Sequence, residues 1–232
     1  MGLSPSGVKA EMALRLASVA NTDPSQFDGE LRHLRPVPVR SIVSMDLGLK
    51  NFAFAHLDLT SVGHVREWRR IEVHSPSPYH PAPFAAVGVA LAARLPAADL
   101  YLIEAQRHRS GGAATVIEHA IKLRLLEVLL HAQLLGRAAS VQPKRVAGLF
   151  ELPEGRGKKK DAVVRARTII ADSMREGMLS FAPEAKNAFE EETKRDDMSD
   201  ALLQALAVIR WRKAADEFRN IFEEKSQLEL SA

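Results

Sequence analysis

The chain has 232 residues, of which 46% are hydrophobic and 26% are charged, and its formal net charge is +3. This length fits one sizeable domain with a small additional unit, and the hydrophobic content is sufficient for a packed core. The absence of cysteine excludes disulfide bonds and thiolate zinc sites, and no apolar run approaches the roughly 20 residues that a membrane span requires, so we expect no membrane partner.

The N-terminal segment, 1–36, is predicted to form a small helical unit. Met12, Leu16 and Val19 recur at helical spacing and would share one face. The start of the chain is charged and periodic, which does not fit the apolar core of a secretory signal. The prolines of "RPVPVR" at 35–40 then predict an extended linker.

The main domain is predicted to cover 40–225 and to begin with three strands. The first strand is the apolar segment 41–46, which ends before a turn at Gly48. The second alternates large and small residues over 51–59, and the third covers 62–74. Short turns between these strands favour an antiparallel meander.

Helices alternate with two further strands in the rest of this domain. The apolar segment "LYLIE", 100–104, is typical of a buried parallel strand, and "ASVQPKRVAGLF", 139–150, is interpreted as a short strand and a turn. The predicted helices cover 83–95, 111–136, 158–176, 183–192 and 196–224. This order predicts an α/β fold with a mixed five-stranded sheet flanked by helices.

Acidic residues stand at three places that such a fold would bring together. Asp46 ends the first predicted strand, and Glu104 ends the fourth. Asp196, Asp197 and Asp200 open the last helix, where Asp200 could share a helix face with either of the other two. Because sites in open α/β sheets gather at the carboxyl ends of strands, these side chains are candidates for one site.

A set of carboxylates on separate elements suits phosphodiester hydrolysis. Two Mg²⁺ ions about 3.5–4 Å apart can neutralise the scissile phosphate and activate a water, and Mg²⁺ prefers oxygen ligands. Each acidic position also has a structural explanation, since Asp46 could be a turn residue, and Asp196 and Asp197 could stabilise the start of a helix. The combination of all three positions favours a metal site.

Three segments resemble the motifs of a known family: "SMDLGLKNFAFA", "LIEAQRHRS" and "KRDDMSDALLQALA". They resemble the fungal mitochondrial Holliday-junction resolvases, which are cruciform-cutting endonucleases of the RuvC-like branch of the ribonuclease H superfamily. The resemblance runs over about 40–215. It implies a ribonuclease H-like fold, a mitochondrial location, and a homodimer that cuts a four-way DNA junction with paired symmetric nicks.

The resemblance also implies a catalytic set. The metal ligands would be Asp46, Glu104, Asp197 and Asp200, with Asp196 as the alternative to Asp197. They would hold two Mg²⁺ ions, which Mn²⁺ could replace, and Asp46 would bridge the two ions.

The segment "GLSPSGVKAEMALRL" resembles the later part of a SAP motif, a small helical DNA-binding unit. Lys9 would then contact DNA, while Met12 stands where the motif usually has leucine and Ser4 where it usually has proline. The first helix of such a motif would lie before Met1, so we expect the natural chain to begin earlier.

Basic and amide side chains near the acidic positions are predicted to contact DNA, because Lys and Arg displace the counterions of a phosphate backbone. A solvated helix start would also explain the lysine run after 154. The predicted DNA contacts are Lys50, Gln106, Arg107, Arg109, Lys144, Lys158, Lys159 and Lys160.

The helix predicted over 111–136 is apolar on more than one face. We therefore expect one face to pack on the sheet and another on a partner subunit. Two alternative functions stay open, namely a ribonuclease H-like nuclease that cuts RNA–DNA hybrids and a DNA-binding protein without catalysis.

Overall fold

The structure is a computed structural model, and it describes residues 39–60, 63–74, 76, 78–106, 114–152, 158–177 and 179–230. The predicted helical unit over 1–36 lies outside these residues, together with Lys9, Arg107 and Arg109. The segment Pro38–Ala205 forms one compact unit, and the chain from Leu206 onward belongs to a second unit.

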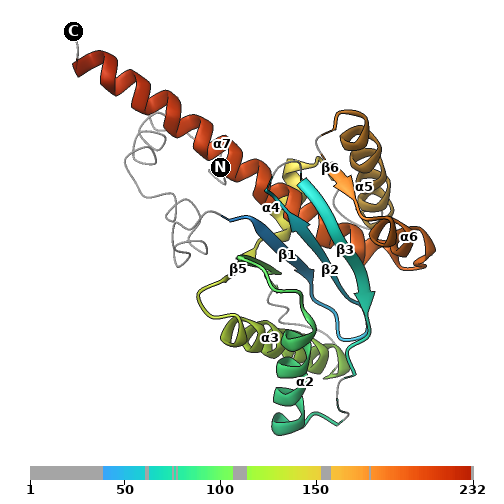
Figure 1. Ribbon diagram of the computed structural model, residues 1–232. Coiled ribbons are helices and arrows are strands. Elements are labelled where there is room, and N and C mark those ends of the chain that lie inside the picture. The colour runs from blue at the N-terminus through green and yellow to red at the C-terminus, as the bar shows by residue number, and fades with distance from the viewer. Residues whose placement is uncertain are drawn as a thin grey trace. The chain divides into compact units, whose positions relative to one another are not determined.

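A single six-stranded sheet with the order β5-β4-β1-β2-β3-β6 lies at the centre of the first unit (Figure 1). Strands β1 (Ser41–Asp46), β2 (Phe52–Asp58) and β3 (Gly63–Ile71) pair antiparallel, which confirms the predicted meander. Strand β4 (Leu100–Glu104) lies parallel to β1, and β5 (Ala138–Val141) lies parallel to β4.

The expected number of five strands is wrong, because a sixth strand, β6 (Leu179–Phe181), pairs parallel with β3. Its three residues are too few to show the alternation by which a strand is recognised in a sequence.

Six helices are described in the structure, and they correspond to the five predicted ones with one addition. The addition is α4 (Pro143–Leu149), where a turn was predicted; Pro143 stands in its first turn, a position where proline suits a helix. The other helices are α2 (Pro81–Arg94), α3 (Ala114–Gln133), α5 (Lys158–Arg175), α6 (Pro183–Glu191) and α7 (Arg195–Leu230). No described helix is long and apolar enough to cross a membrane.

Helices α2 and α3 cover one face of the sheet, and that face carries its large side chains. Met45, Phe54 and Ile103 are fully buried there with Phe84 of α2 and Leu130 of α3. The two helices approach closely, since a Cβ added to Gly88 would lie 2.8 Å from the Cβ of Leu129.

The opposite face of β2 carries small residues, which leave room for a large neighbour. Ala55 lies directly across from Trp68 of β3, so both point to the same face. Trp68 is buried, stacks on Phe189 at 4.0 Å between ring centroids, and donates its indole N–H to the carbonyl oxygen of Met198 on α7 at 2.7 Å. The large–small alternation of β2 thus has a physical reason, and it places α6 and the start of α7 against this second face.

Candidate active site

The pleat of two neighbouring strands directs Asp46 and Glu104 to the face of the sheet that α7 covers. Ser44 and Leu102 lie side by side in the parallel pair of β1 and β4, so their side chains share a face. Asp46 lies two residues after Ser44, and Glu104 lies two residues after Leu102. Because side chains of a strand alternate between its faces, Asp46 and Glu104 point to that same face. The two carboxyl groups therefore stand together at the carboxyl ends of adjacent strands.

Helix α7 brings the remaining acidic residues to this place. Its first turn carries Asp196 and Asp197, and Asp200 follows one turn before Gln204. The amide Nε2 of Gln204 lies 3.1 Å from the hydroxyl oxygen of Ser44, 3.2 Å from the carbonyl oxygen of Met45 and 3.3 Å from that of Leu102. This buried amide joins the helix to the two strands immediately behind their acidic ends. Sequence reasoning missed Gln204, although a glutamine within an apolar helix face was a visible signal.

The electrostatics of Asp46 show that four carboxyl groups meet. Its pKa is raised well above the ordinary value, first by burial and then by the charge of Glu104 and a hydrogen bond with that carboxyl group. The charges of Asp200 and Asp197 raise the pKa further. Asp196 is not among the groups that raise the pKa of Asp46, so of the two neighbouring aspartates it is Asp197 whose charge acts on Asp46.

A cleft opens at this point of the molecule. Asp46, Glu104, Asp200 and Gln204 form its polar part, and its space of about 330 Å³ includes a part that is open to solvent. The remaining lining residues come from α4 and the segment after it: Pro143, Val146, Ala147 and Leu152. One wall of the cleft thus consists of the helix that the sequence did not predict.

The donor set of this cleft is of the type that a hard divalent cation uses. Carboxylates close enough to raise the pKa of Asp46 are stabilised by a compensating positive charge, and oxygen donors are the ligands that Mg²⁺ prefers. In the side-chain positions described, no three His, Asp or Glu residues surround a common point at metal-binding distance. Asp46 instead shares its hydrogen bond with Glu104, so these two side chains would have to turn toward a shared ion.

The predicted DNA contacts occupy different surroundings. Lys50, Lys144 and Lys160 are exposed, while Gln106 is half-buried and donates its side-chain N–H to the carbonyl oxygen of Glu104 at 3.2 Å. Arg124 of α3, which sequence reasoning missed, donates to the carbonyl oxygen of Gln106 at 2.8 Å. It fixes the chain just beyond Glu104. The side chains of Lys158 and Lys159, like Arg107 and Arg109, lie outside the described part of the chain.

Comparison with known proteins gives a family match over part of the chain and a fold. The family described as mitochondrial resolvase Ydc2 / RNA splicing MRS1 matches residues 42–149. The crystal structure of the yeast mitochondrial Holliday junction resolvase Ydc2 is similar over 96% of this chain and 93% of that chain, with a TM-score of 0.69 and 22% identity. This likeness confirms the expected ribonuclease H-like, RuvC-like α/β fold.

Two further solved structures show a weaker likeness. Thermus thermophilus RuvC in complex with a Holliday junction substrate covers 74% of this chain and 95% of its own, with a TM-score of 0.44 and 14% identity. The fowlpox virus resolvase in complex with junction DNA covers 73% and 97%, with a TM-score of 0.44 and 16% identity. A search of curated proteins found no match.

Proposed function

We propose that the chain belongs to the Ydc2-like mitochondrial Holliday junction resolvases, whose family model matches residues 42–149, and that it is a metal-dependent endonuclease that cuts four-way DNA junctions. The observation that carries this proposal is the convergence of four carboxyl groups, seen in the raised pKa of Asp46 next to Glu104, Asp197 and Asp200. A protein that only bound DNA would have no use for such repulsion in a cleft.

In this proposal the same four carboxylates would hold two Mg²⁺ or Mn²⁺ ions. Such ions would supply positive charge for the scissile phosphate and activation of the attacking water, for a hydrolysis that leaves a 5′-phosphate and a 3′-hydroxyl. Glu104 ends the strand next to the one that Asp46 ends, whereas Asp197 and Asp200 lie on α7. Gln204 holds the helix and the strands in this relation through its contacts with Met45 and Leu102.

The experiment that tests the proposal is cleavage of a synthetic four-way junction with and without Mg²⁺. The wild-type protein should produce paired, symmetric, ligatable nicks, and Asp46→Asn should bind the junction without cutting it. An RNA–DNA hybrid and a structured RNA serve as competitors, since the family description also includes an RNA splicing protein. Preferential cutting of the hybrid would indicate a nuclease for RNA–DNA hybrids in place of the junction nuclease. Binding of RNA with no metal-dependent cutting of any substrate would indicate an RNA-binding protein.

DNA contacts are proposed for three exposed lysines and for two arginines that follow Glu104. Lys50, Lys144 and Lys160 are exposed and available for a phosphate backbone. The double replacement of Arg107 and Arg109 by alanine should weaken junction binding, because both arginines follow Glu104 closely in the sequence. Unchanged junction affinity in that variant would remove the two arginines from the proposal.

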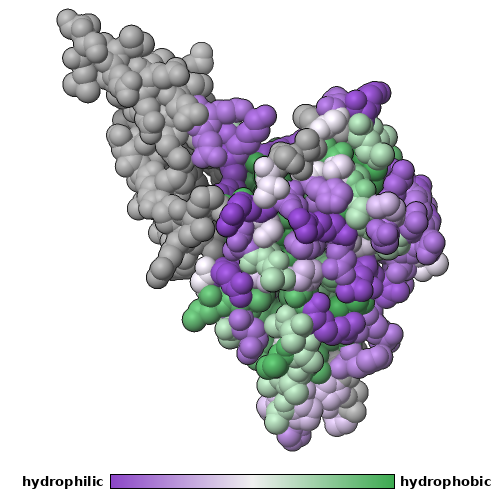
Figure 2. Space-filling model, viewed as in Figure 1, coloured by the Kyte–Doolittle hydropathy of each residue, from purple (hydrophilic) through white to green (hydrophobic). Residues whose placement is uncertain are grey.

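We also propose a homodimer that packs through α3. The side of α3 that faces the sheet buries Leu126 and Leu130, whereas Ile121 and Val128 are 51% and 63% exposed. Leu135, just beyond the helix, is 84% exposed and continues their spacing of seven residues. Figure 2 shows hydrophobic side chains on the part of the molecule where α2 and α3 lie.

The dimer can be tested with a matched pair of variants. Val128→Glu should yield a monomer in light scattering at micromolar concentration, because a charge would be buried in the proposed interface. Val164→Glu on α5 is the control, since Val164 is 62% exposed and should tolerate the charge. A wild-type monomer, or a Val128→Glu dimer, would contradict this interface. The mitochondrial location that the family name carries can be tested by fractionation of cells expressing the natural gene.

A further inference from the structure

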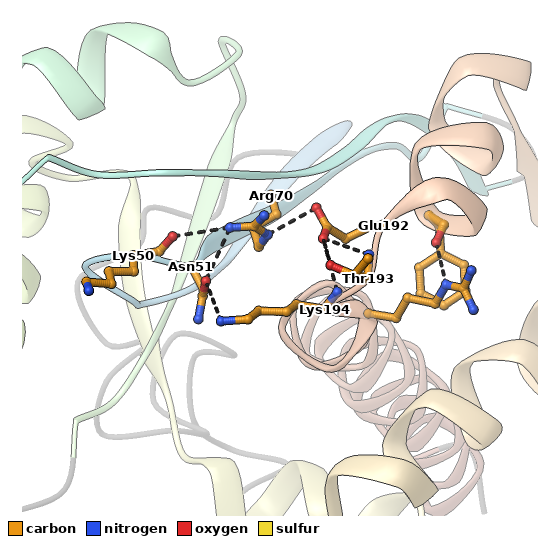
Figure 3. Close-up of polar contacts among 8 residues, drawn as sticks. Lys50, Asn51, Arg70, Glu192, Thr193 and Lys194 are labelled. Atoms are coloured by element: carbon orange, nitrogen blue, oxygen red, sulfur yellow. Dashed lines mark hydrogen bonds and ion pairs between the residues drawn. The ribbon is translucent and has the colours of Figure 1, made fainter.

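Arg70 of β3 joins two segments that flank the four carboxylates (Figure 3). Its Nη1 donates to the carbonyl oxygen of Lys50 and to Oδ1 of Asn51, both at 3.2 Å, in the turn that follows Asp46. Its Nε donates to Oε2 of Glu192 at 3.0 Å, in the segment that precedes α7. One half-buried guanidinium group therefore ties the turn after β1 to the start of the helix that carries the aspartates.

Glu192 holds its own segment in place. Its Oε1 accepts the backbone N–H of Thr193 at 2.8 Å and that of Lys194 at 3.0 Å. The backbone hydrogen bond from Lys194 lowers the pKa of Glu192 below its ordinary value, and the side chains of Arg70 and Thr193 add to this shift. The Glu192 carboxylate thus fixes the backbone before α7, and in the described part of the chain it forms no ion pair with Lys50 or Lys194.

Asn51 joins the segment before α7 to the turn that carries Lys50. Its Oδ1 accepts a hydrogen bond from Nζ of Lys194 at 3.3 Å, while Lys50 precedes it directly in the turn. Both lysine side chains are exposed, and within the part of the chain that the structure describes neither forms an ion pair. Figure 3 shows Lys194 extending toward Asn51 from the side of α7 and Lys50 leaving the turn on the other side.

The position of Lys194 is unfavourable for the helix that follows it. A cation directly before α7 meets the positive end of the helix dipole, whereas Arg195 turns back and donates to the carbonyl oxygen of Phe189 at 3.0 Å. An exposed cation at this position, which forms no ion pair in the described part of the chain, is available to a ligand with negative charge.

We propose that Lys50 and Lys194 each bind a backbone phosphate of the nucleic acid beside the cleft. Lys50 follows Asp46 by four residues and Lys194 precedes Asp197 by three, so each lies within about 14 Å of chain from a carboxylate. At a rise of about 3.4 Å per nucleotide, the bound phosphates belong to the few nucleotides next to the cut. This inference rests on the proposed function and adds the residues that hold the strand there; Lys194 was not among the predicted DNA contacts.

The test is the salt dependence of junction binding in EDTA, where no cleavage occurs. Each lost phosphate contact lowers the slope of log K against log salt concentration by about 0.9, which corresponds to about eight-fold weaker binding at 0.1 M salt. Lys194→Gln and Lys50→Gln should each show this change, and Lys194→Arg should keep the wild-type slope because it keeps the charge. Lys186→Gln is the matched control, an exposed lysine on α6.

The outcomes separate this inference from the function on which it rests. A wild-type slope for Lys194→Gln, with a wild-type protein that binds the junction, overturns the lysine pair alone. An equal loss in Lys186→Gln overturns it as well, because the effect would then be a general one of charge. A wild-type protein that binds neither the junction nor a linear duplex overturns the proposed function. Thermal unfolding of each variant shows that exposed lysines were changed without loss of the fold.

Discussion

Replacing Gln204 with methionine should loosen α7 from the strands that carry Asp46 and Glu104 while keeping a side chain of similar length. The amide nitrogen has two hydrogens, which three acceptors on β1 and β4 share at 3.1–3.3 Å. The variant therefore loses two hydrogen bonds, each worth about 0.5–1.5 kcal/mol net, or about 1–3 kcal/mol together. For a domain of this size each kcal/mol lowers the melting temperature by about 2–4 °C.

Thermal unfolding measures this loss, with Gln133→Met as the matched control. Gln133 is exposed on α3, so the same substitution there should change stability by less than about 0.5 kcal/mol. Titration with Mn²⁺ adds a second readout, because loss of a residue that orients metal ligands typically weakens metal binding about 10- to 100-fold. A Gln204→Met protein that melts within about 1 °C of the control and binds Mn²⁺ like the wild type would refute this role of Gln204.

Three further predictions concern the cleft and its support. The raised pKa of Asp46 means that the metal-free folded state holds this proton more tightly than the unfolded chain, so stability falls as pH rises from 3.8 through the folded pKa. Above that pH window, Asp46→Asn should thus melt a few degrees higher than the metal-free wild type, and Mg²⁺ should not raise its melting temperature. It should also cleave at least about 100-fold more slowly. A melting temperature below that of the metal-free wild type at neutral pH would contradict the repulsion between the carboxylates. Gly88→Ala should lower the free energy of unfolding in urea by about 1–3 kcal/mol, because its Cβ would lie 2.8 Å from Leu129. Gly148→Ala on α4 is the control, and it should be neutral or stabilising because nothing lies within 4 Å of its Cβ. Equal effects of the two substitutions would show that α2 and α3 move apart without cost. Trp68→Phe keeps a ring against its stacking partner and removes the 2.7 Å hydrogen bond to α7, so it should lower the free energy of unfolding by about 1–3 kcal/mol, and wild-type stability would mean that this bond is worth nothing.

Local sequence patterns were sufficient to predict several elements of the fold. The apolar run of β1 and the large–small alternation of β2 predict strands, because a pleat repeats every two residues. The same rule placed Asp46 and Glu104 at strand ends, and helical spacing placed Asp197 and Asp200 on one face. Patterns of short elements failed, since the three residues of β6 and the seven of α4 offer too few repeats to distinguish them from turns.

The sequence by itself thus determined which residues are candidates for the chemistry, because carboxylates that end buried strands and open an apolar helix are visible without coordinates. Only the tertiary structure decided what surrounds them. Gln204 meets Ser44 across 160 residues of sequence, and Lys194 meets Asn51 across 143. Contacts over such separations depend on how strands and helices pack, which no local pattern encodes, and they bring acidic residues of β1, β4 and α7 together at one cleft.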